Sequence, residues 1–250
     1  MPATPAWPPK STPRLYLDRP IGTGASVELD PAQARYLVNV MRRGSGDPVR
    51  LFDDATGEYL ARLAASGAGG RCLAVVEEKL APREEVPDLW LCASPLQRDN
   101  FAWMAEKACE LGVRRFVPVE MRRSVVRKIN PERLRKRMIE AAEQCGRTAL
   151  PELAAMTKLD RLVGGWPADR TLFFADELGG ETTAECFAAH AGPAALLIGP
   201  EGGFDDAERA MIRDLAQARP VSLGPRILRA ETAAIAATAA WMALAGDWRN

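Results

Sequence analysis

Between residues 89 and 244 of this 250-residue chain, short apolar runs alternate with segments in which apolar residues recur at helical spacing. Apolar runs of this length are typical of strands that are buried on both faces, and the helical segments between them are the crossovers that parallel strands need. The sequence therefore predicts an α/β fold with a mostly parallel sheet that helices cover on both faces. The predicted strands are residues 89–93, 116–119, 171–175, 194–198 and 220–223.

Amphipathic helices are predicted between these strands. Asn130 and Pro131 supply an N-cap and a first-turn proline for one helix, and Asp205 with Glu208 predicts a capping box at the start of another. The last helix, residues 231–244, is rich in alanine, which permits either a tight contact within the chain or a subunit interface. Two of the helices are recognised from the apolar series Phe101, Met104, Ala108 and Leu111, and Leu134, Met138, Ala142 and Cys145.

A different pattern precedes residue 80. Short alternating apolar segments, separated by Gly, Pro and Asp, predict a small β domain over residues 14–80. Residues 81–88 combine two prolines with several charges and predict a linker to a second domain at residues 89–250. Residues 1–13 are rich in proline and lack an apolar stretch, so we expect a flexible tail and not a signal peptide.

Several function classes are excluded by what the sequence lacks. The 5 cysteines form no C-x-x-C pair, which indicates a reducing, cytoplasmic compartment and no metal site. No apolar run reaches membrane-spanning length. There is no G-x-x-x-x-G-K-[ST] motif, and no G-x-G-x-x-G follows an early strand, which excludes P-loop hydrolases and nicotinamide enzymes. The only histidine, His190, is predicted to be structural, which leaves hydrolase chemistry without a base.

The formal net charge of zero conceals a strong segregation of charge along the chain. Residues 114–147 carry 11 Lys and Arg against 4 Asp and Glu, whereas residues 151–210 carry 4 against 11. A segment this basic attracts the phosphates of a nucleic acid, or it forms an ordinary solvated helix face. Charge alone leaves both interpretations open.

Two glycine-containing loops follow predicted strands and open with the same Gly-Pro pair. One covers residues 198–204 (IGPEGGF) and the other residues 223–232 (LGPRILRAET). Ligands of open α/β sheets bind beyond the carboxyl ends of the strands, and glycine there lets the backbone approach a ligand closely. Two such loops, with charged residues at positions 201, 226, 229 and 231, favour a binding site over two structural turns.

Four segments of the chain closely resemble the ribosomal RNA small-subunit methyltransferase E family of the SPOUT superfamily. They are LLIGPEGGF at residues 196–204, LGPRILRAETA at 223–233, EKACELGV at 106–113 and EAAEQCGR at 140–147. The resemblance implies methylation of N3 of a uridine in 16S rRNA, within the small ribosomal subunit, with S-adenosylmethionine as the cofactor. It also implies a homodimer, a C-terminal trefoil knot in the α/β domain and a PUA-like RNA-binding character for the first 80 residues.

The resemblance extends to individual site residues. Arg229 is expected to stabilise negative charge on the uracil. Glu201 or Glu231 is a candidate for the base that accepts the N3 proton, although either carboxylate can equally cap a helix or pair with an arginine. The cofactor is expected to contact backbone and apolar groups of Ala175, Asp176, Ile198, Gly199, Pro200, Glu201, Gly202, Leu223, Gly224, Pro225, Ile227, Leu228 and Thr232.

The RNA contacts are expected from arginines in both domains. Phosphate contacts of this kind anchor RNA without selecting its sequence, and each arginine has solvated surface as its alternative. The sequence departs from the common family pattern at Arg35 and Tyr36, where many members have two histidines, and at Gln97 and Asn100, where Lys and Arg are frequent. A SPOUT enzyme acting on another RNA such as tRNA, and a non-catalytic RNA-binding protein, are the alternative functions. The candidate arginines are Arg14, Arg42, Arg43, Arg122, Arg123, Arg127 and Arg147.

Overall fold

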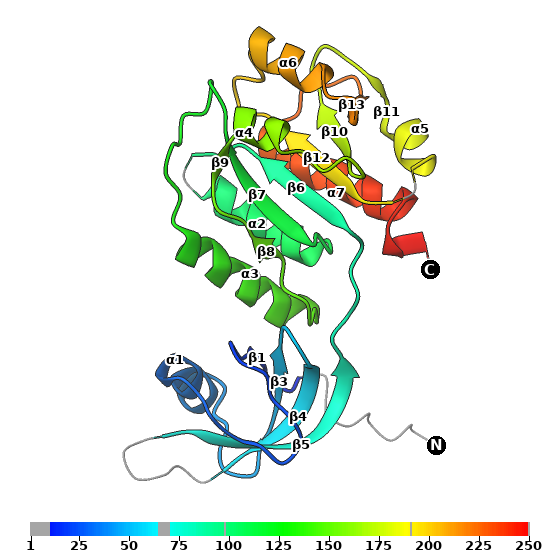
Figure 1. Cartoon of the computed structure of the whole chain (residues 1–250). Coiled ribbons are helices and arrows are strands. Elements are labelled where there is room, and N and C mark those ends of the chain that lie inside the picture. The colour runs from blue at the N-terminus through cyan, green and yellow to red at the C-terminus, as the bar shows by residue number, and fades with distance from the viewer. Residues whose placement is uncertain (1–10, 65–70, 98, 191, 250) are drawn as a thin grey trace. The chain divides into compact units, whose positions relative to one another are not determined.

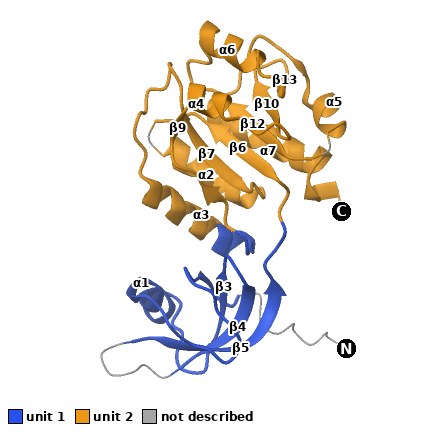
Figure 2. Cartoon of the chain, in the orientation of Figure 1, with its two compact units in different colours: residues 1–85, 142–149 blue, residues 86–141, 150–250 orange. Residues whose placement is uncertain are grey.

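The computed structural model describes residues 11–64, 71–97, 99–190 and 192–249, and the chain divides into two compact units. The first unit contains residues 1–85 together with residues 142–149, and the second contains residues 86–141 and 150–250 (Figure 2). The predicted division at residues 81–88 stays a prediction, but the return of residues 142–149 to the first unit was not expected. Of the predicted tail, residues 1–10 lie outside the described residues, whereas the Pro13 carbonyl accepts a hydrogen bond from the Arg50 N–H at 2.8 Å.

The first unit is built on a five-stranded sheet with the order β1-β3-β4-β5-β2 (Figure 1). The alternating apolar segments form strands as predicted, and every pairing is antiparallel except β1 with β3. Gly57 is required at the start of β4, because its φ is +116° and a Cβ there would lie 2.2 Å from the Ala81 carbonyl oxygen. The strands are β1 (Arg14–Tyr16), β2 (Ser26–Glu28), β3 (Pro48–Asp53), β4 (Gly57–Leu63) and β5 (Leu73–Pro82).

Between β2 and β3 the chain forms two short helices that the sequence analysis missed. Helix α1 (Pro31–Arg35) begins with a capping box between Asp30 and Gln33, and it leads directly into a π-helix, η1 (Tyr36–Val40). Only Leu37 of η1 is buried, where it joins the core of the unit. The β-type alternation of the flanking segments gives no sign of these five-residue helices.

The second unit confirms the predicted α/β fold. Its sheet has the order β11-β13-β10-β12-β6-β7-β8, with β9 paired to β7, and each of its pairings is parallel. The five predicted strands are β6 (Leu89–Ala93), β7 (Arg115–Glu120), β10 (Thr171–Ala175), β12 (Ala194–Ile198) and β13 (Ala218–Ser222). The shorter strands β8 (Glu152–Leu153), β9 (Thr157–Lys158) and β11 (Glu181–Thr182) were not predicted. The threading of the chain into a knot stays a prediction.

Helices cover both faces of this sheet. On β10, Leu172 and Phe174 share a buried cluster with Ile212 of α6, whereas Phe173 packs against Phe187 of α5 at 5.0 Å between ring centroids. Because neighbouring residues of a strand point to opposite faces, α5 and α6 lie on opposite sides. The helices are α2 (Asn100–Glu110), α3 (Pro131–Cys145), α4 (Leu159–Gly164), α5 (Thr183–Ala188), α6 (Asp206–Arg213) and α7 (Ala230–Leu244), followed by η2 (Asp247–Arg249).

The helix starts follow their predicted capping residues. The Glu208 N–H donates to the Asp205 side chain at 2.8 Å, and the Asp205 N–H donates to the Glu208 carboxylate at 3.2 Å, which completes the capping box of α6. The Arg133 N–H donates to the Asn130 side chain at 3.0 Å at the start of α3. Among the described residues, no helix has the length and apolar character needed to cross a membrane.

Candidate functional site

Three adjacent parallel strands, β13, β10 and β12, end at one edge of the sheet in the second unit. The loops that leave these ends line a cavity of about 540 Å³, together with the first turns of α7. This is the place where open parallel sheets bind ligands. The lining residues are Ala175, Asp176, Glu177, Leu178, Gly179, Ile198, Gly199, Pro200, Glu201, Gly203, Phe204, Val221, Ser222, Leu223, Gly224, Pro225, Arg226, Ile227, Leu228, Arg229, Ala230 and Ala233.

The loop after β12 is anchored from beneath by Phe204. This side chain is almost completely buried, and its ring meets Phe174 of β10 edge-on at 6.2 Å between centroids. The Phe204 ring lies against Gly199, where a Cβ would be 3.3 Å from it, and residues 199, 200, 201 and 203 of the loop line the cavity. A glycine-rich loop that ends in a buried aromatic side chain is rigid enough to bind a ligand through its main chain.

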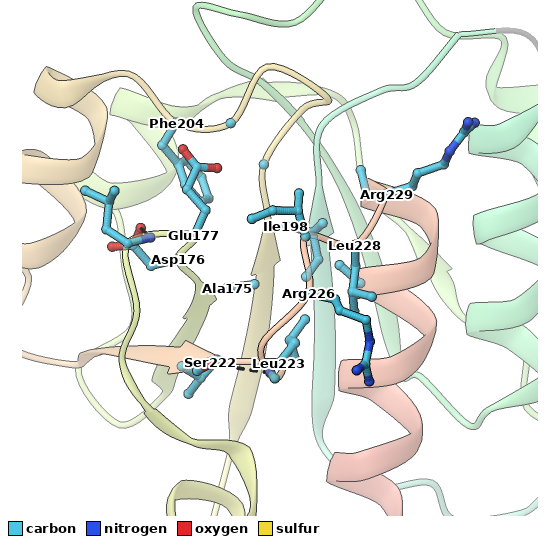
Figure 3. Close-up of a pocket in the computed structure, with 18 of the residues that line it drawn as sticks. Ala175, Asp176, Glu177, Ile198, Phe204, Ser222, Leu223, Arg226, Leu228 and Arg229 are labelled. Carbon is cyan, nitrogen blue, oxygen red and sulfur yellow. Dashed lines mark hydrogen bonds between the residues drawn. The ribbon is translucent and has the colours of Figure 1, made fainter.

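The predicted cofactor residues are largely brought together. Figure 3 shows Ile198 of β12, and Leu223 and Leu228 of the second Gly-Pro loop, around the cavity. Eleven of the 13 predicted positions line it, whereas Gly202 and Thr232 do not. A Cβ at Gly202 would lie 3.4 Å from the Arg123 side chain, so that position faces the arginine. Which of these residues contact a ligand stays a prediction.

The two candidate carboxylates have different surroundings. Glu201 is exposed and lines the cavity. Glu231 lies outside the lining, and its carboxylate accepts a hydrogen bond from the Asn100 side chain at 3.1 Å. The donor of this hydrogen bond, Asn100, is one of the positions at which the sequence departs from the common family pattern. Of the two, Glu201 is the carboxylate that a bound substrate would reach from the cavity.

Two arginines of the second Gly-Pro loop reach the site without partners. Arg226 and Arg229 are both exposed, and neither donates to any residue in the described part of the chain. Figure 3 shows their side chains pointing away from one another on either side of Leu228. Arg229 is the N-cap residue of α7, and its side chain does not cap the helix. An unpaired guanidinium at a helix N-terminus is a strong donor for developing negative charge.

A buried ion cluster lies beside the cavity at the end of β10. The Asp176 carboxylate is fully buried and accepts hydrogen bonds from Arg209 at 3.1 Å, Arg213 at 2.7 Å and the Leu178 N–H at 3.1 Å. Burial by itself raises the pKa of Asp176, but these donors outweigh it and hold the pKa below the usual value of 3.8. Asp176 is therefore ionised at neutral pH, and its carboxylate is occupied by these three donors, so it is a poor proton acceptor.

The basic segment reaches the loop after β12 through two arginines. The Arg123 guanidinium donates to the Gly202 carbonyl at 2.8 Å and the Phe204 carbonyl at 3.2 Å. The Arg122 guanidinium donates to Asp205 at 3.1 Å, and its backbone N–H donates to Glu208 at 2.7 Å. Arg127 pairs with Glu120 at 2.7 Å. These arginines are exposed, so their contacts leave room for phosphates, but Arg123 also holds the loop.

Two of the arginines predicted to contact phosphates, Arg14 and Arg147, have buried side chains. The Arg14 side chain is 8% exposed, lies over the Phe52 ring and pairs with the equally buried Glu58 at 2.9 Å. It also donates to the Arg147 carbonyl at 2.6 Å. Arg147 is itself buried and pairs with Glu84 at 3.4 Å. Both arginines hold residues 142–149 within the first unit, and a contact of either with RNA stays a prediction.

The remaining arginine candidates lie after the π-helix of the first unit. Arg42 is exposed and has a φ of +52°, the one positive value at a non-glycine position among the described residues. Arg43 is half-buried and donates to the Ser11 carbonyl at 3.4 Å. A non-glycine residue in this region of backbone space is strained, and such residues cluster at active sites and ligand-binding loops. Exposed Tyr36, Val38 and Val40 lie on the same π-helix.

Some lining residues escaped the sequence analysis. Glu177, Leu178 and Gly179 follow β10, and Ser222 ends β13, so all of them obey the rule that placed the two Gly-Pro loops. The loop after β10 lacks a Gly-Pro signature, and that absence concealed it. His190 packs edge-on against Phe173 at 5.2 Å, away from the lining. No cluster of metal-ligating side chains occurs within residues 11–64, 71–97, 99–190 and 192–249.

Family models match both units. An RNA methyltransferase domain model matches residues 83–242, and an RNA methyltransferase PUA domain model matches residues 29–77. The first model covers the whole cavity, and the second covers α1, η1 and most of the five-stranded sheet. The comparison therefore separates a methyltransferase segment from a PUA segment along the chain.

Individual relatives match over nearly the full length. The chain is 31% identical to ribosomal RNA small subunit methyltransferase E of Synechocystis sp., with 86% of this chain and 72% of the relative covered. It is 29% identical to the protein of that name from Rickettsia conorii, with 90% and 93% covered. A crystal structure of ribosomal RNA small subunit methyltransferase E from Neisseria gonorrhoeae, bound to S-adenosyl methionine, superposes with a TM-score of 0.86 at 28% identity, covering 95% of this chain and 99% of that one.

Proposed function

Because the chain belongs to the ribosomal RNA small subunit methyltransferase E family, we propose that it transfers a methyl group from S-adenosylmethionine to N3 of a uridine in 16S rRNA. The family assignment bears out the resemblance seen in segments 196–204 and 223–233. The observation that carries the proposal is the meeting of these two segments in one cavity, at the carboxyl ends of β12 and β13.

The cavity suits the cofactor in size and chemistry. A volume of about 540 Å³ lies within the range of roughly 300–1,000 Å³ that is usual for small-molecule sites. Ile198, Leu223 and Leu228 offer apolar contacts to an adenosine, and the glycine-rich backbone offers donors and acceptors. Glu177 and Glu201 place carboxylates where a cofactor with net positive charge would be held. These residues would hold S-adenosylmethionine, which supplies an electrophilic methyl group when bound.

Positioning is the main task of the chain in this reaction, since methyl transfer is an in-line displacement. The N3 of uracil is a weak nucleophile until its proton leaves, and the resulting negative charge spreads over the uracil oxygens. The proposed stabiliser of that charge is Arg229, and its unpaired guanidinium at the N-terminus of α7 supports this role. Glu201 is the proposed acceptor of the proton, because Glu231 is held by Asn100.

Recognition of the RNA is proposed for both units. In the second unit, Arg122 and Arg123 offer exposed guanidinium groups next to the loop after β12, and Arg127 offers one that pairs with Glu120. In the PUA segment, Arg42 and Arg43 follow the π-helix. We further propose that the chain is a homodimer with a knotted C-terminal part, and that it acts on the small ribosomal subunit in the cytoplasm. In this scheme the chain uses no metal ion and binds no membrane.

The function is tested by incubating the purified chain with methyl-labelled S-adenosylmethionine and three RNAs: naked small-subunit rRNA, assembled small subunits and tRNA. Mass spectrometry of the digested RNA should find 3-methyluridine at one position of 16S rRNA. Label in tRNA alone would favour a SPOUT enzyme with another substrate. Calorimetry without any binding of the cofactor would favour a non-catalytic RNA-binding protein.

Two arginine variants test the assignment of Arg229. Arg229→Ala should lower kcat by about 100-fold, the usual loss for one charge-stabilising donor. Arg226→Ala is the matched control, because it removes an equally unpaired arginine from the same loop whose side chain points the other way (Figure 3). Equal losses in the two variants would show that the loop contributes only general positive charge.

A further inference from the structure

The ion cluster at the end of β10 includes further carboxylates besides the buried Asp176. It consists of Asp176, Glu177, Asp206, Arg209 and Arg213, and we call it the Arg209 cluster. Asp176 and Glu177 lie in the loop that follows β10, whereas the other three residues belong to α6. The cluster therefore ties a loop that lines the cavity to a helix that does not.

The Arg209 guanidinium contacts three carboxylates at once. Its Nε donates to Asp176 at 3.1 Å, its Nη2 to Glu177 at 3.0 Å and its Nη1 to Asp206 at 3.3 Å. The planar, forked group of arginine presents donors in several fixed directions, which a lysine ammonium on the same stem cannot reproduce. The Arg209 side chain is only 10% exposed, so its orientation is fixed by these contacts and by packing.

The three carboxylates differ in what they can do for the cavity. Asp176 is fully buried and already satisfied by Arg213 and the Leu178 N–H. Asp206 is fully exposed on the first turn of α6 and does not line the cavity. Only Glu177 combines a contact to Arg209 with a position in the lining, and its side chain is 42% exposed.

Glu177 also joins the loops after β10 and β12. A Cβ at Gly203 would lie 2.4 Å and 2.6 Å from its two carboxylate oxygens, so the carboxylate rests directly on that glycine. Figure 3 shows the Glu177 side chain pointing from its own strand end toward the loop that carries Phe204. One carboxylate oxygen accepts from Arg209, and the second accepts no hydrogen bond within the described part of the chain.

We propose that Arg209 is a positioning residue for the cofactor: it acts through Glu177, whose carboxylate it fixes on Gly203 at the cavity wall. The fixed carboxylate sets the spacing of the loops after β10 and β12 and keeps one oxygen oriented for a donor of the bound cofactor. Without Arg209, the half-exposed Glu177 side chain is free to turn into solvent. The proposal rests on the proposed function, because it requires that the cavity binds S-adenosylmethionine.

The test is a double-mutant cycle on the full-length chain, with the dissociation constant of S-adenosylmethionine measured by calorimetry in the absence of RNA. Arg209→Met should weaken binding by about tenfold, the value of one hydrogen bond to a charged group. In the Glu177→Gln background, the same Arg209→Met change should weaken binding by less than twofold, because the group through which Arg209 acts has already been altered.

Asp206→Asn is the matched control for Glu177→Gln. Both substitutions neutralise a carboxylate that accepts from the same guanidinium, but only Glu177 lines the cavity. Asp206→Asn should leave the dissociation constant within twofold of the wild-type value. Arg209→Lys provides a second variant should Arg209→Met fail to fold, and it is expected to weaken binding at least threefold, since one ammonium cannot hold all three carboxylates.

The outcomes distinguish failure of the proposed function from failure of the positioning role of Arg209. A wild-type chain that binds no S-adenosylmethionine would refute the proposed function itself. A wild-type chain that binds, with Arg209 variants that bind equally well, would refute the positioning role. Equal losses from Arg209→Met in the wild-type and Glu177→Gln backgrounds would also refute it, because Arg209 would then act through the general stability of α6.

Discussion

Gly203→Ala perturbs the contact between Gly203 and Glu177, which joins the loops after β12 and β10. The new Cβ would lie 2.4 Å from one Glu177 oxygen, whereas real Cβ atoms essentially never come closer than 3.0 Å to another heavy atom. Glu177 is the flexible partner and must withdraw, which breaks its 3.0 Å hydrogen bond to Arg209. The φ of +68° adds a backbone cost, because L-residues are disfavoured in the left-handed region.

The expected magnitude follows from these two costs. The left-handed backbone costs about 1 kcal/mol for alanine. The lost hydrogen bond costs about 1 kcal/mol, a value at the low end for charged groups because Glu177 is partly exposed. Gly203→Ala should therefore lower the free energy of unfolding by about 2 kcal/mol, which corresponds to a Tm decrease of roughly 4–8 °C for a unit of this size.

The assay compares Gly203→Ala in two backgrounds by urea and thermal unfolding. In a Glu177→Ala chain the backbone cost remains but the collision is gone, so the same substitution should cost only about 1 kcal/mol. The difference between backgrounds isolates the contact of Glu177 with Gly203. An identical loss in both backgrounds would refute the reasoning, because the glycine would then be needed only for its backbone conformation.

Three further predictions concern charges elsewhere. Hydrogen bonds hold the pKa of Asp176 below 3.8, so its ion pairs stabilise the second unit fully above pH 3.8, and this stabilisation is lost as the pH falls through the lower pKa of the folded state. In Asp176→Asn, this loss of stability at low pH should be absent from the acid unfolding curve. Arg14→Met should destabilise the first unit by about 2 kcal/mol in urea, because the buried carboxylate of Glu58 keeps only its pairing with Arg50, and a loss under 1 kcal/mol would contradict this. Arg42→Asn keeps a residue that tolerates a positive φ, so stability should be retained while RNA affinity and the slope of its salt dependence fall by about one phosphate contact; unchanged RNA binding would remove Arg42 from the interface.

The strands and loops of the second unit were predictable because their signals are local. The run AALLI of β12 is apolar at every position, and the Gly-Pro pair marks its end. The rule that ligands bind beyond the carboxyl ends of parallel strands then placed the cavity. The loop after β10 follows the same rule, but it carries Asp176 and Glu177 in place of a Gly-Pro pair and was only partly recognised.

Side-chain destinations were less predictable than the elements that carry them. Arg14 and Arg122 are both arginines next to a turn or strand, yet one is buried on Phe52 and the other is exposed. What separates them is the return of residues 142–149 to the first unit, a contact more than 120 residues distant in sequence that no periodicity encodes. Long-range pairing of this kind is visible only in the folded chain.

The charge segregation acquires a physical explanation once the contacts are known. Some of the acidic residues between positions 151 and 210 are paired with arginines, and the carboxylates of Asp176 and Glu177 bind Arg209 of the same segment. Asp205 and Glu208 instead accept from Arg122, which belongs to the basic segment.

Arg122 and Arg123 thus have two functions. They present positive charge to solvent, and they hold the loop after β12 through hydrogen bonds to its carbonyls and capping carboxylates. We expect a phosphate to draw Arg123 away from the Gly202 carbonyl, which would loosen the loop that lines the cofactor cavity. Calorimetry of S-adenosylmethionine with and without a phosphate-rich RNA should therefore show a change in affinity in the wild type. In Arg123→Ala that change should be absent, and a change that persisted would place the coupling elsewhere.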